Sequence, residues 1–377
     1  MLPIRKIHKP LNILSQRLTD LPAPINISFW WNYGSLLGLF LIIQIIRGVF
    51  LSIHYCPNME LAFSSLVHIT RNVNWGWIIH NIHINGASIF LLFIYIHIAR
   101  GIYYMSFYII KTWNTGVTIF IFTIITAFIG YVLPWGQISF WAATVITNIF
   151  SAIPYLGNYT VSWLWGGFAV SNATLNRFFI LHFLLPFIIL LLIILHFIIL
   201  HETGSNNPLG VNSNSDRVPF HTYFTLKDIL GFTISITILL ILITLSPNTL
   251  LDPENFIEAN PITTPNHIQP EWYFLWLYAI LRSVPNKLGG VIALLLAIII
   301  LYLPPIFYDN KISLRFCAPA QLIFFTILAS WLILRWIGKC PVEHPFILIG
   351  QLSRTFYFTY FLLIPYLSNI WTTLTTK

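Results

Sequence analysis

Charged residues are scarce in this chain of 377 residues. Asp, Glu, Lys and Arg make up only 8% of it, whereas 57% of the residues are hydrophobic. Soluble globular domains carry about 25% charged residues, so this composition excludes a water-soluble fold and indicates an integral membrane protein. The formal net charge of +8 is then a signal of orientation in the membrane, and nothing in the chain suggests nucleic acid as a partner.

Cysteine is scarce as well. The three cysteines, Cys56, Cys317 and Cys340, lie far apart in the sequence. Their spacing fits neither a disulfide framework nor a zinc site, and the C-x-x-C-H motif that attaches haem covalently does not occur. Any haem is therefore expected to be held without thioether links.

Long apolar runs are what the chain has in abundance. Runs of about 18 or more apolar residues cross a bilayer as helices, so we predict an all-α integral membrane protein with eight transmembrane helices. If the N-terminus is inside, the inner segments hold more Lys and Arg than the outer ones, which predicts that both termini are inside. The predicted spans are 33–53, 77–104, 114–133, 175–200, 229–247, 288–308, 319–338 and 346–366.

Two of the predicted outer connections are long. The first, 134–174, contains no charged residue and includes an amphipathic run at 137–150 that is suited to lie along the membrane interface. The second, 248–287, carries acidic residues among prolines. Loops of this length in a compact domain usually have a function.

One spacing is shared by four histidines and four glycines. They form pairs fourteen residues apart, and each pair lies in a different one of the first four predicted helices. Fourteen residues are nearly four helical turns, so both members face the same way, about 21 Å apart along the axis. Because successive helices alternate in direction, the residues fall into two levels. The outer level holds Gly48, His83, Gly130 and His182, and the inner level holds Gly34, His97, Gly116 and His196.

Paired histidines at two levels point to two bound metal centres. A single membrane histidine can instead form an interhelical hydrogen bond, and a single glycine can serve close helix packing. Zinc or copper would require three or four ligands at each level, whereas two imidazoles across a flat space lined by glycine suit an iron porphyrin. Iron with two axial histidines has no open position, which favours electron transfer over oxygen binding. Arg100 is expected either to face a haem propionate or to snorkel to the interface.

Together with three motifs, this pattern resembles the cytochrome b family of respiratory ubiquinol–cytochrome c oxidoreductases (complex III) over essentially the whole chain. The resemblance implies two b haems, the low-potential one held by His83 and His182 and the high-potential one by His97 and His196. The motifs are GYVLPWG at 130–136, HETGSNNP at 201–208 and PEWY at 270–273.

The resemblance also implies a division into two parts. Residues 1–210 form a four-helix haem-binding bundle around the two stacked haems, and residues 211–377 form a C-terminal four-helix domain for the quinol site and packing. The implied partners are a Rieske-type iron–sulfur protein, cytochrome c1, other complex III subunits, ubiquinone, membrane lipid and a second copy of the chain. Compact length and an Ile-, Phe- and Asn-rich composition favour the mitochondrial inner membrane, with both termini on the matrix side.

At the outer face the resemblance implies a site for ubiquinol oxidation, built from the run 137–150 and the PEWY motif. One electron passes to the iron–sulfur protein and the other to the outer haem. Glu271 is a carboxylate in an apolar, proline-bounded setting, which suits a proton acceptor; the alternative is a solvated loop acid. Tyr273 belongs to the same motif, and Tyr131 and Tyr278 are either wall residues of the site or ordinary interfacial tyrosines.

At the inner face the resemblance implies a site for quinone reduction. His201, Ser205 and Asp228 occupy the positions of the family's quinone ligands. A His/Asp pair suits proton uptake because imidazole titrates near neutral pH. The alternative is a solvated connection with a helix-capping Asp.

Two positions depart from the family pattern. Ala142 stands where the family more often has Gly, and its methyl group is expected to narrow the outer quinone pocket. His80 stands where many members have an Arg that faces a propionate of the outer haem. Arg47, beside Gly48, is a candidate to supply the missing cation.

Two other classes of membrane protein were considered. A secondary transporter predicts inverted repeats and acidic residues at the midplane, and the spans of this chain lack Asp and Glu. A haem–copper oxidase subunit needs further histidines that converge on copper, but the remaining histidines lie mostly at helix ends and in loops.

The departure at Ala142 leads to a first prediction. Ala142→Gly is expected to strengthen the binding of bulky outer-site inhibitors roughly tenfold, because one methyl group is removed from a tight pocket. The measurement is the inhibitor concentration that halves quinol oxidation in each form. Equal potency in the two forms contradicts the prediction.

Overall fold

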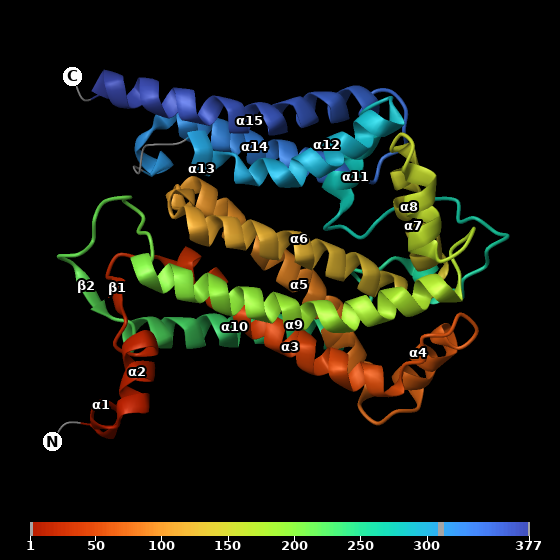
Figure 1. Ribbon diagram of the computed structural model, residues 1–377, viewed down its shortest axis with the longest axis horizontal. Helices are drawn as coiled ribbons and strands as arrows, with labels where there is room; N and C mark the ends of the chain where they lie inside the picture. Colours follow the sequence, from red (N-terminus) through yellow and green to blue (C-terminus); the bar gives the residue numbers. More distant parts are fainter. Residues whose placement is uncertain (1–2, 308–312, 376–377) are drawn as a thin grey trace.

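Long helices run side by side along an elongated molecule (Figure 1). The computed structural model describes residues 3–307 and 313–375, so the last residue of the predicted span 288–308 lies outside the described residues. Both chain ends lie at the same end of the molecule (Figure 1). We call this the inner end and the opposite one, with α7 and α8, the outer end.

Seven helices in the described ranges are long and apolar enough to cross a membrane. Five of them match their predicted spans to within four residues at each end, whereas α10 begins six residues earlier and α15 ends nine residues later than predicted. The helices are α3 (Asn32–His54), α5 (Gly76–Tyr103), α6 (Ile110–Val132), α9 (Asn172–Thr203), α10 (Tyr223–Leu245), α14 (Ala318–Ile337) and α15 (Phe346–Thr375).

The remaining predicted span, 288–308, is not one continuous helix. It divides into α12 (Lys287–Ile299), the 3-10 turn η5 (Ile300–Tyr302) and α13 (Pro304–Phe307). The 13 residues of α12 reach only about 20 Å, which is short of the ~30 Å apolar layer. Pro304 and Pro305 lack the backbone N–H that a continuing helix needs, so the apolar run in the sequence overstated the length of the helix.

Shorter elements lie at the two ends of the molecule. The predicted amphipathic run 137–150 forms α7 and the start of η3, and one small antiparallel strand pair, β1–β2, is added to the expected all-α fold. These elements are α1 (Ile4–Ile7), α2 (Lys9–Leu18), β1 (Pro22–Pro24), η1 (Phe29–Trp31), α4 (Ala62–Arg71), η2 (Ser106–Tyr108), α7 (Gln137–Asn148), η3 (Ile149–Ala152), α8 (Gly157–Trp165), β2 (Arg217–Pro219), η4 (Pro253–Phe256), α11 (Leu275–Arg282) and η6 (Leu314–Phe316).

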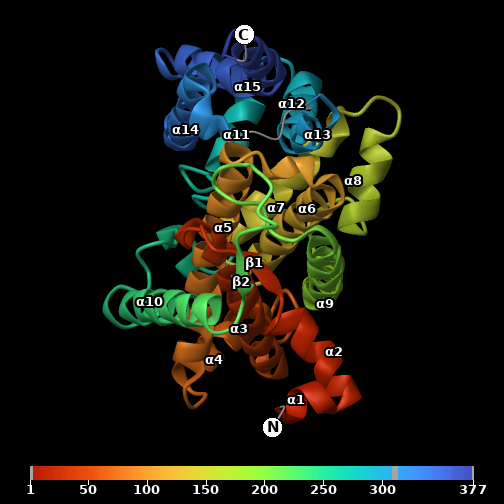
Figure 2. The ribbon, with the colours of Figure 1, turned by 90° about the vertical axis from the view of Figure 1, so that its left-hand side faces the viewer.

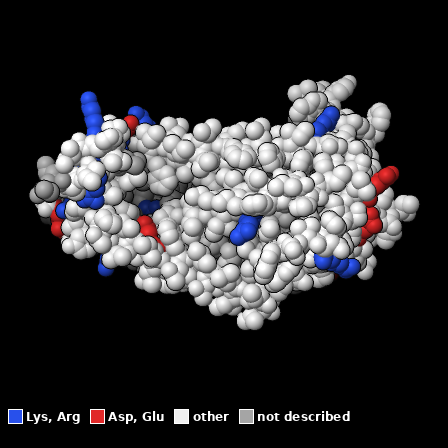
Figure 3. Space-filling model, turned by 90° about the horizontal axis from the view of Figure 1, so that it is seen from below, with Lys and Arg blue, Asp and Glu red and all other residues white. Residues whose placement is uncertain are grey.

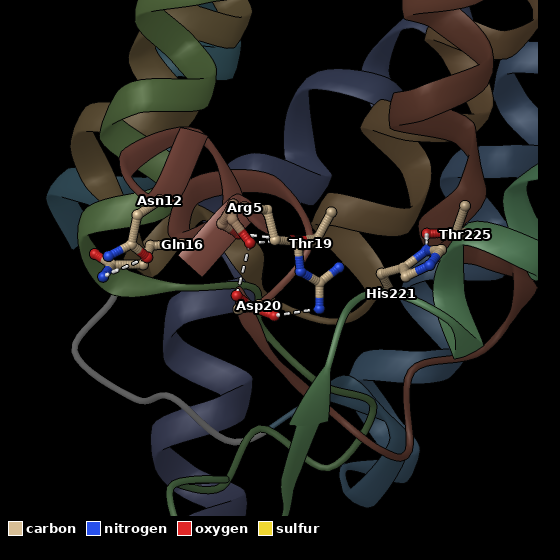
Figure 4. Close-up of polar contacts among 8 residues, drawn as sticks. Arg5, Asn12, Gln16, Thr19, Asp20, His221 and Thr225 are labelled. Atoms are coloured by element: carbon tan, nitrogen blue, oxygen red, sulfur yellow. Dashed lines mark hydrogen bonds and ion pairs between the residues drawn. The ribbon is translucent and has the colours of Figure 1, made fainter. Parts of the chain in front are cut away.

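The N-terminal segment has polar contacts within itself (Figure 4) and is joined to the inner end by backbone hydrogen bonds. Asp20 accepts hydrogen bonds from Ser15 (2.7 Å) and Arg5 (3.5 Å). The backbone N–H of His221 donates to the carbonyl of Thr19, and β1 pairs with β2 alongside. The segment before the first membrane helix is thereby joined to the polar connection between α9 and α10.

The helices pack around a shared core. α3 packs against α5, α6 against α9, and α14 against α15, while α10 lies on α3 and α5. Seen from the inner end, α5 and α6 lie between α3 on one side and α14 and α15 on the other (Figure 2). One cluster of buried side chains extends from Phe40 and Leu91 to Leu277 and Phe361, so the helices of both halves of the chain share an apolar interior.

Charge is confined mostly to the two ends of the molecule. In the view of Figure 3 the Lys, Arg, Asp and Glu side chains gather there, and the band between them is almost free of charge apart from one basic patch. Arg5–Asp20 is the one ion pair found in the part of the chain that is described. An uncharged band between two polar ends is the distribution that a bilayer imposes.

Candidate functional site

Each of the four spaced glycines faces one of the four spaced histidines. A Cβ atom added to Gly130 would collide with the imidazole of His182, whereas at the other three glycines it would come into van der Waals contact with the facing imidazole. Small residues at these positions let the rings approach the backbone of the neighbouring helix. The distances from the added Cβ to the imidazole Cε1 are 3.5 Å for Gly34 and His97, 3.3 Å for Gly48 and His83, and 3.2 Å for Gly116 and His196.

The outer level contains a cavity between two facing imidazoles. The ring centroids of His83 and His182 are 6.2 Å apart, and the planes are almost perpendicular at 86°. A metal ion bound between the two rings would need two metal–nitrogen bonds of about 2 Å each. These bonds and the distance from each ring centre to its nitrogen together match the observed separation of the centroids. The cavity has a volume of about 200 Å³ and is lined mainly by apolar residues, with Gly48 and Gly130 on its walls. This donor set and its glycine-lined walls fit a haem.

Two threonines hold the Nδ1 atoms of histidine ligands. His182 Nδ1 donates to the carbonyl of Thr126 at 2.9 Å, and His196 Nδ1 is 3.0 Å from the hydroxyl of Thr115. A hydrogen bond at Nδ1 fixes the ring and leaves Nε2 free for a metal. The sequence does not reveal either contact, because the contact at Thr126 is made by a backbone carbonyl and the one at Thr115 depends on how α6 is rotated toward α9.

Arg100 lies at the inner level. Its Nη2 donates to His97 Nδ1 at 3.2 Å, and its guanidinium lies 5.2 Å from the centroid of the Trp31 ring. Its Nε is buried without a hydrogen-bond partner among the described residues, as is Nε1 of Trp31. An unneutralised cation with a free donor in apolar surroundings fits an anionic group such as a haem propionate.

At the outer level, His80 lines the cavity and Arg47 does not. Arg47 is half-buried on α3, where its neighbours Gly48 and Leu51 line the cavity while Ile46 and Phe50 are exposed. Gln44 lines the cavity, and its Nε2 is buried without a hydrogen-bond partner in the described part of the chain. His80 and Gln44 are therefore polar groups available to a haem edge at this level, and the role expected of Arg47 stays a prediction.

The two long outer connections pack against each other. Gln137, at the start of α7, donates from its backbone N–H to Ile257 (2.9 Å) and from its side chain to Thr263 (2.9 Å). Its side-chain carbonyl accepts from the N–H of Asn260 at 2.7 Å. The amphipathic helix and the acidic loop thus form one layer over the outer end of the bundle. Ala142 is buried in α7 and does not line the cavity between His83 and His182.

Glu271 is a buried carboxylate beneath this layer. Its Oε1 and the Tyr131 hydroxyl both lack a hydrogen-bond partner among the described residues. Burial raises the pKa of Glu271 to about 7, against the smaller opposing effects of Tyr131 and Lys339. Burial also holds the pKa of the Tyr273 hydroxyl well above its usual value, so this group stays protonated. The guanidinium of Arg282 lies 5.0 Å from the centroid of the Tyr278 ring.

The inner candidate residues lie at the ends of α9 and α10. Asp228 accepts from the hydroxyl of Ser35 at 2.7 Å, a partner that the sequence analysis missed although Ser35 follows Gly34 directly. His201 is half-buried in the last turn of α9, and Ser205 follows it in the connection. In residues 3–307 and 313–375, no hydrogen bond or ion pair joins His201, Ser205 and Asp228 to one another.

The contact between Gly130 and His182 leads to a second prediction. Gly130→Ala is expected to displace the His182 ring and to remove the outer haem signal from the optical spectrum, while the inner one remains. Gly38→Ala is the matched control, since a Cβ at this membrane-helix glycine meets no atom within 4 Å. Retention of both haem signals in Gly130→Ala contradicts the prediction.

Comparison with known proteins agrees with this geometry. Residues 18–204 match the family model described as cytochrome b/b6/petB, and residues 258–358 match that of cytochrome b (C-terminal)/b6/petD. A solved structure titled "Hyperthermophilic respiratory Complex III" contains a chain that is 29% identical to this one, with a TM-score of 0.92 over 97% of this chain and 98% of that chain. The chain therefore belongs to the cytochrome b/b6 family of haem-binding membrane proteins of electron transport.

Proposed function

We propose that this chain is the catalytic haem subunit of a quinol–cytochrome c oxidoreductase. It oxidises ubiquinol at the outer site, reduces quinone at the inner site and couples these reactions to proton translocation. The observation that carries the proposal is the two-level register of glycines and histidines on α3, α5, α6 and α9. Family membership and the likeness to a complex III chain support it.

Two b haems are proposed to be held by His83 with His182 and by His97 with His196. When bound, each haem supplies one-electron transfer at an iron without an open ligand position. The chain's own residues orient the ligands: Thr126 and Thr115 hold the Nδ1 atoms, and the glycines leave room at the four walls. Arg100 would balance the charge of an inner propionate.

At the outer site Glu271 is proposed to accept a proton from the quinol at its free Oε1 atom. A carboxyl whose pKa is about 7 is partly ionised at neutral pH and can both take up and release a proton. The hydroxyl of Tyr131 lies near this carboxyl and opposes the rise of its pKa. Tyr273 stays neutral and forms part of the wall.

At the inner site His201, Ser205 and Asp228 are proposed to bind quinone and to supply protons. Asp228 is oriented by the hydroxyl of Ser35, and the neighbouring Lys227 donates to the carbonyl of Ile27 at 2.7 Å. These contacts fix the start of α10 against the segment before α3. The carboxylate therefore has a defined position from which to deliver a proton.

Placing the two sites at opposite faces makes the electron path electrogenic. One charge that crosses the whole membrane against 100 mV requires about 2.3 kcal/mol. Two haems at fixed levels let electrons do this work without movement of the helices. The arrangement therefore needs a rigid bundle, in agreement with the shared core of both halves.

The proposed assembly and location follow the family. We assign a Rieske-type iron–sulfur protein and cytochrome c1 as electron-transfer partners, with other complex III subunits and a second copy of the chain. The membrane is the mitochondrial inner membrane, with both termini on the matrix side, and the division near residue 210 separates the haem bundle from the C-terminal domain. Similarity to a chain of a respiratory complex III supports these assignments at the level of a respiratory membrane complex.

An optical spectrum tests the proposal directly. The purified complex is expected to show two b-type haem signals per chain, with no copper, in its reduced-minus-oxidised spectrum. A secondary transporter shows no haem, and a haem–copper oxidase subunit shows copper as well. Absence of haem from the purified chain refutes the proposal.

The pKa of Glu271 leads to a prediction on pH dependence. The carboxyl is protonated below about pH 7 and cannot accept a proton, so the rate of quinol oxidation is expected to rise as the pH increases through that value. Glu271→Gln is expected to abolish this rise and to lower the rate roughly a hundredfold. The initial rate of haem reduction by quinol, measured on both sides of pH 7, checks both statements.

Glu254→Gln is the matched control for this experiment. Glu254 is an exposed acid of the same outer loop, in η4, and its replacement should leave the rate and the pH profile unchanged. An unchanged pH profile in Glu271→Gln would show that another group accepts the proton.

A further inference from the structure

Tyr95 joins the histidine-bearing helix α5 to the loop that carries Glu271. It lies two residues before His97, and its hydroxyl donates to the backbone carbonyl of Tyr273 at 2.6 Å. The same hydroxyl accepts from Nε1 of Trp276, in α11, at 3.1 Å. The Tyr95 hydroxyl thus makes two hydrogen bonds with the segment that is proposed to form the outer site, one as a donor and one as an acceptor.

A second contact joins the same two elements. Nε1 of Trp272 donates to the hydroxyl of Ser88, which is buried on α5 between the two histidines, at 3.3 Å. On the other side of the loop, the guanidinium of Arg335 in α14 lies 4.8 Å from the centroid of the Trp272 ring. The loop is therefore fixed between α5 and α14.

The loop needs such support because of its conformation. Residues 271–274 precede α11, which begins at Leu275; the carbonyls of Glu271 and Phe274 accept backbone N–H groups, whereas the carbonyl of Tyr273 is bonded by the Tyr95 hydroxyl. Tyr273 and Glu271 are nonetheless buried, and a buried carbonyl requires a partner. The Tyr95 hydroxyl is such a partner for the carbonyl of Tyr273.

We propose that Tyr95 is a positioning residue of the outer quinol site, which fixes the Glu271–Tyr273 turn to the helix that carries His83 and His97. The proposal rests on the function proposed above. Because α5 also carries an outer haem ligand, this hydrogen bond sets the place of the proton acceptor relative to the electron acceptor. Small displacements of a reacting group lower rates strongly.

Tyr95→Phe tests this role in the intact complex. It removes the hydroxyl and keeps the ring, which packs against Phe120, Trp276 and Trp331. The expected result is a roughly tenfold fall in kcat/KM for quinol at the outer site, mainly through a lower kcat, because the reacting groups are displaced relative to one another. Both haem signals and the rate of haem reduction through the inner site should be unchanged.

Tyr357→Phe is the matched control. The Tyr357 hydroxyl also donates to a backbone carbonyl, that of Ala297, at 2.7 Å, and its ring also contacts Trp276. Tyr357→Phe therefore removes a comparable buried hydrogen bond that does not involve residues 271–274. A general loss of stability would affect both variants and both quinone sites, whereas the proposed role affects only Tyr95→Phe and only the outer site.

Ser88→Ala provides an independent variant if Tyr95→Phe does not assemble. It removes the acceptor of the Trp272 hydrogen bond, and a smaller fall in outer-site kcat/KM is expected. If the assembled variants show the same outer-site kinetics as Tyr357→Phe, the positioning role is overturned. If the unmodified complex does not oxidise quinol, the proposed function fails instead, so the two failures are distinguishable.

Discussion

The close approach of imidazole rings to helix backbones is the constraint on which the rest of the structure depends. At Gly130 a single added carbon atom would overlap the ring of His182, and the other three glycines leave only van der Waals separation. Such contacts occur at two levels of the bundle formed by α3, α5, α6 and α9. They fix how each helix is rotated about its axis and how far it is shifted along that axis. The remaining helices pack on a bundle whose geometry is already determined.

The same apolar bundle makes every polar group within it costly unless it has a partner. Most polar side chains inside it are satisfied locally, as are Thr123 and Ser235, which donate to carbonyls of their own helices. Exceptions among the described residues include Arg100 at the inner level, Gln44 at the outer level, and Glu271 with Tyr131 beneath the outer layer, besides others such as Asn85 and Trp141. Some of the unsatisfied atoms thus lie where a haem or a quinone is proposed to bind.

Much of this arrangement could be predicted from the sequence, because its signals are periodic. The fourteen-residue spacing predicted which glycine faces which histidine level, and apolar run length predicted eight helices, seven of which are long enough to cross a membrane in the described part of the chain. Run length did not predict that the segment 288–308 is interrupted before Pro304. Contacts that depend on helix rotation or on a folded loop could not be predicted. The backbone carbonyl of Thr126 and the hydroxyls of Ser35 and Tyr95 are ordinary groups in the sequence, and only the packed bundle brings them to His182, Asp228 and Tyr273.

Helix α5 carries more of the proposed mechanism than any other element of the bundle. His83 and His97 lie on it at two levels, Ser88 and Tyr95 lie between them, and these two hold Trp272 and Tyr273 of the outer turn. A rigid helix with all four residues keeps the distance between proton acceptor and electron acceptor constant. A flexible loop could not do so, because an α-helix moves as one body while a turn without regular hydrogen bonds relaxes residue by residue. Fastening the turn to α5 therefore gives an irregular segment the positional precision of a helix.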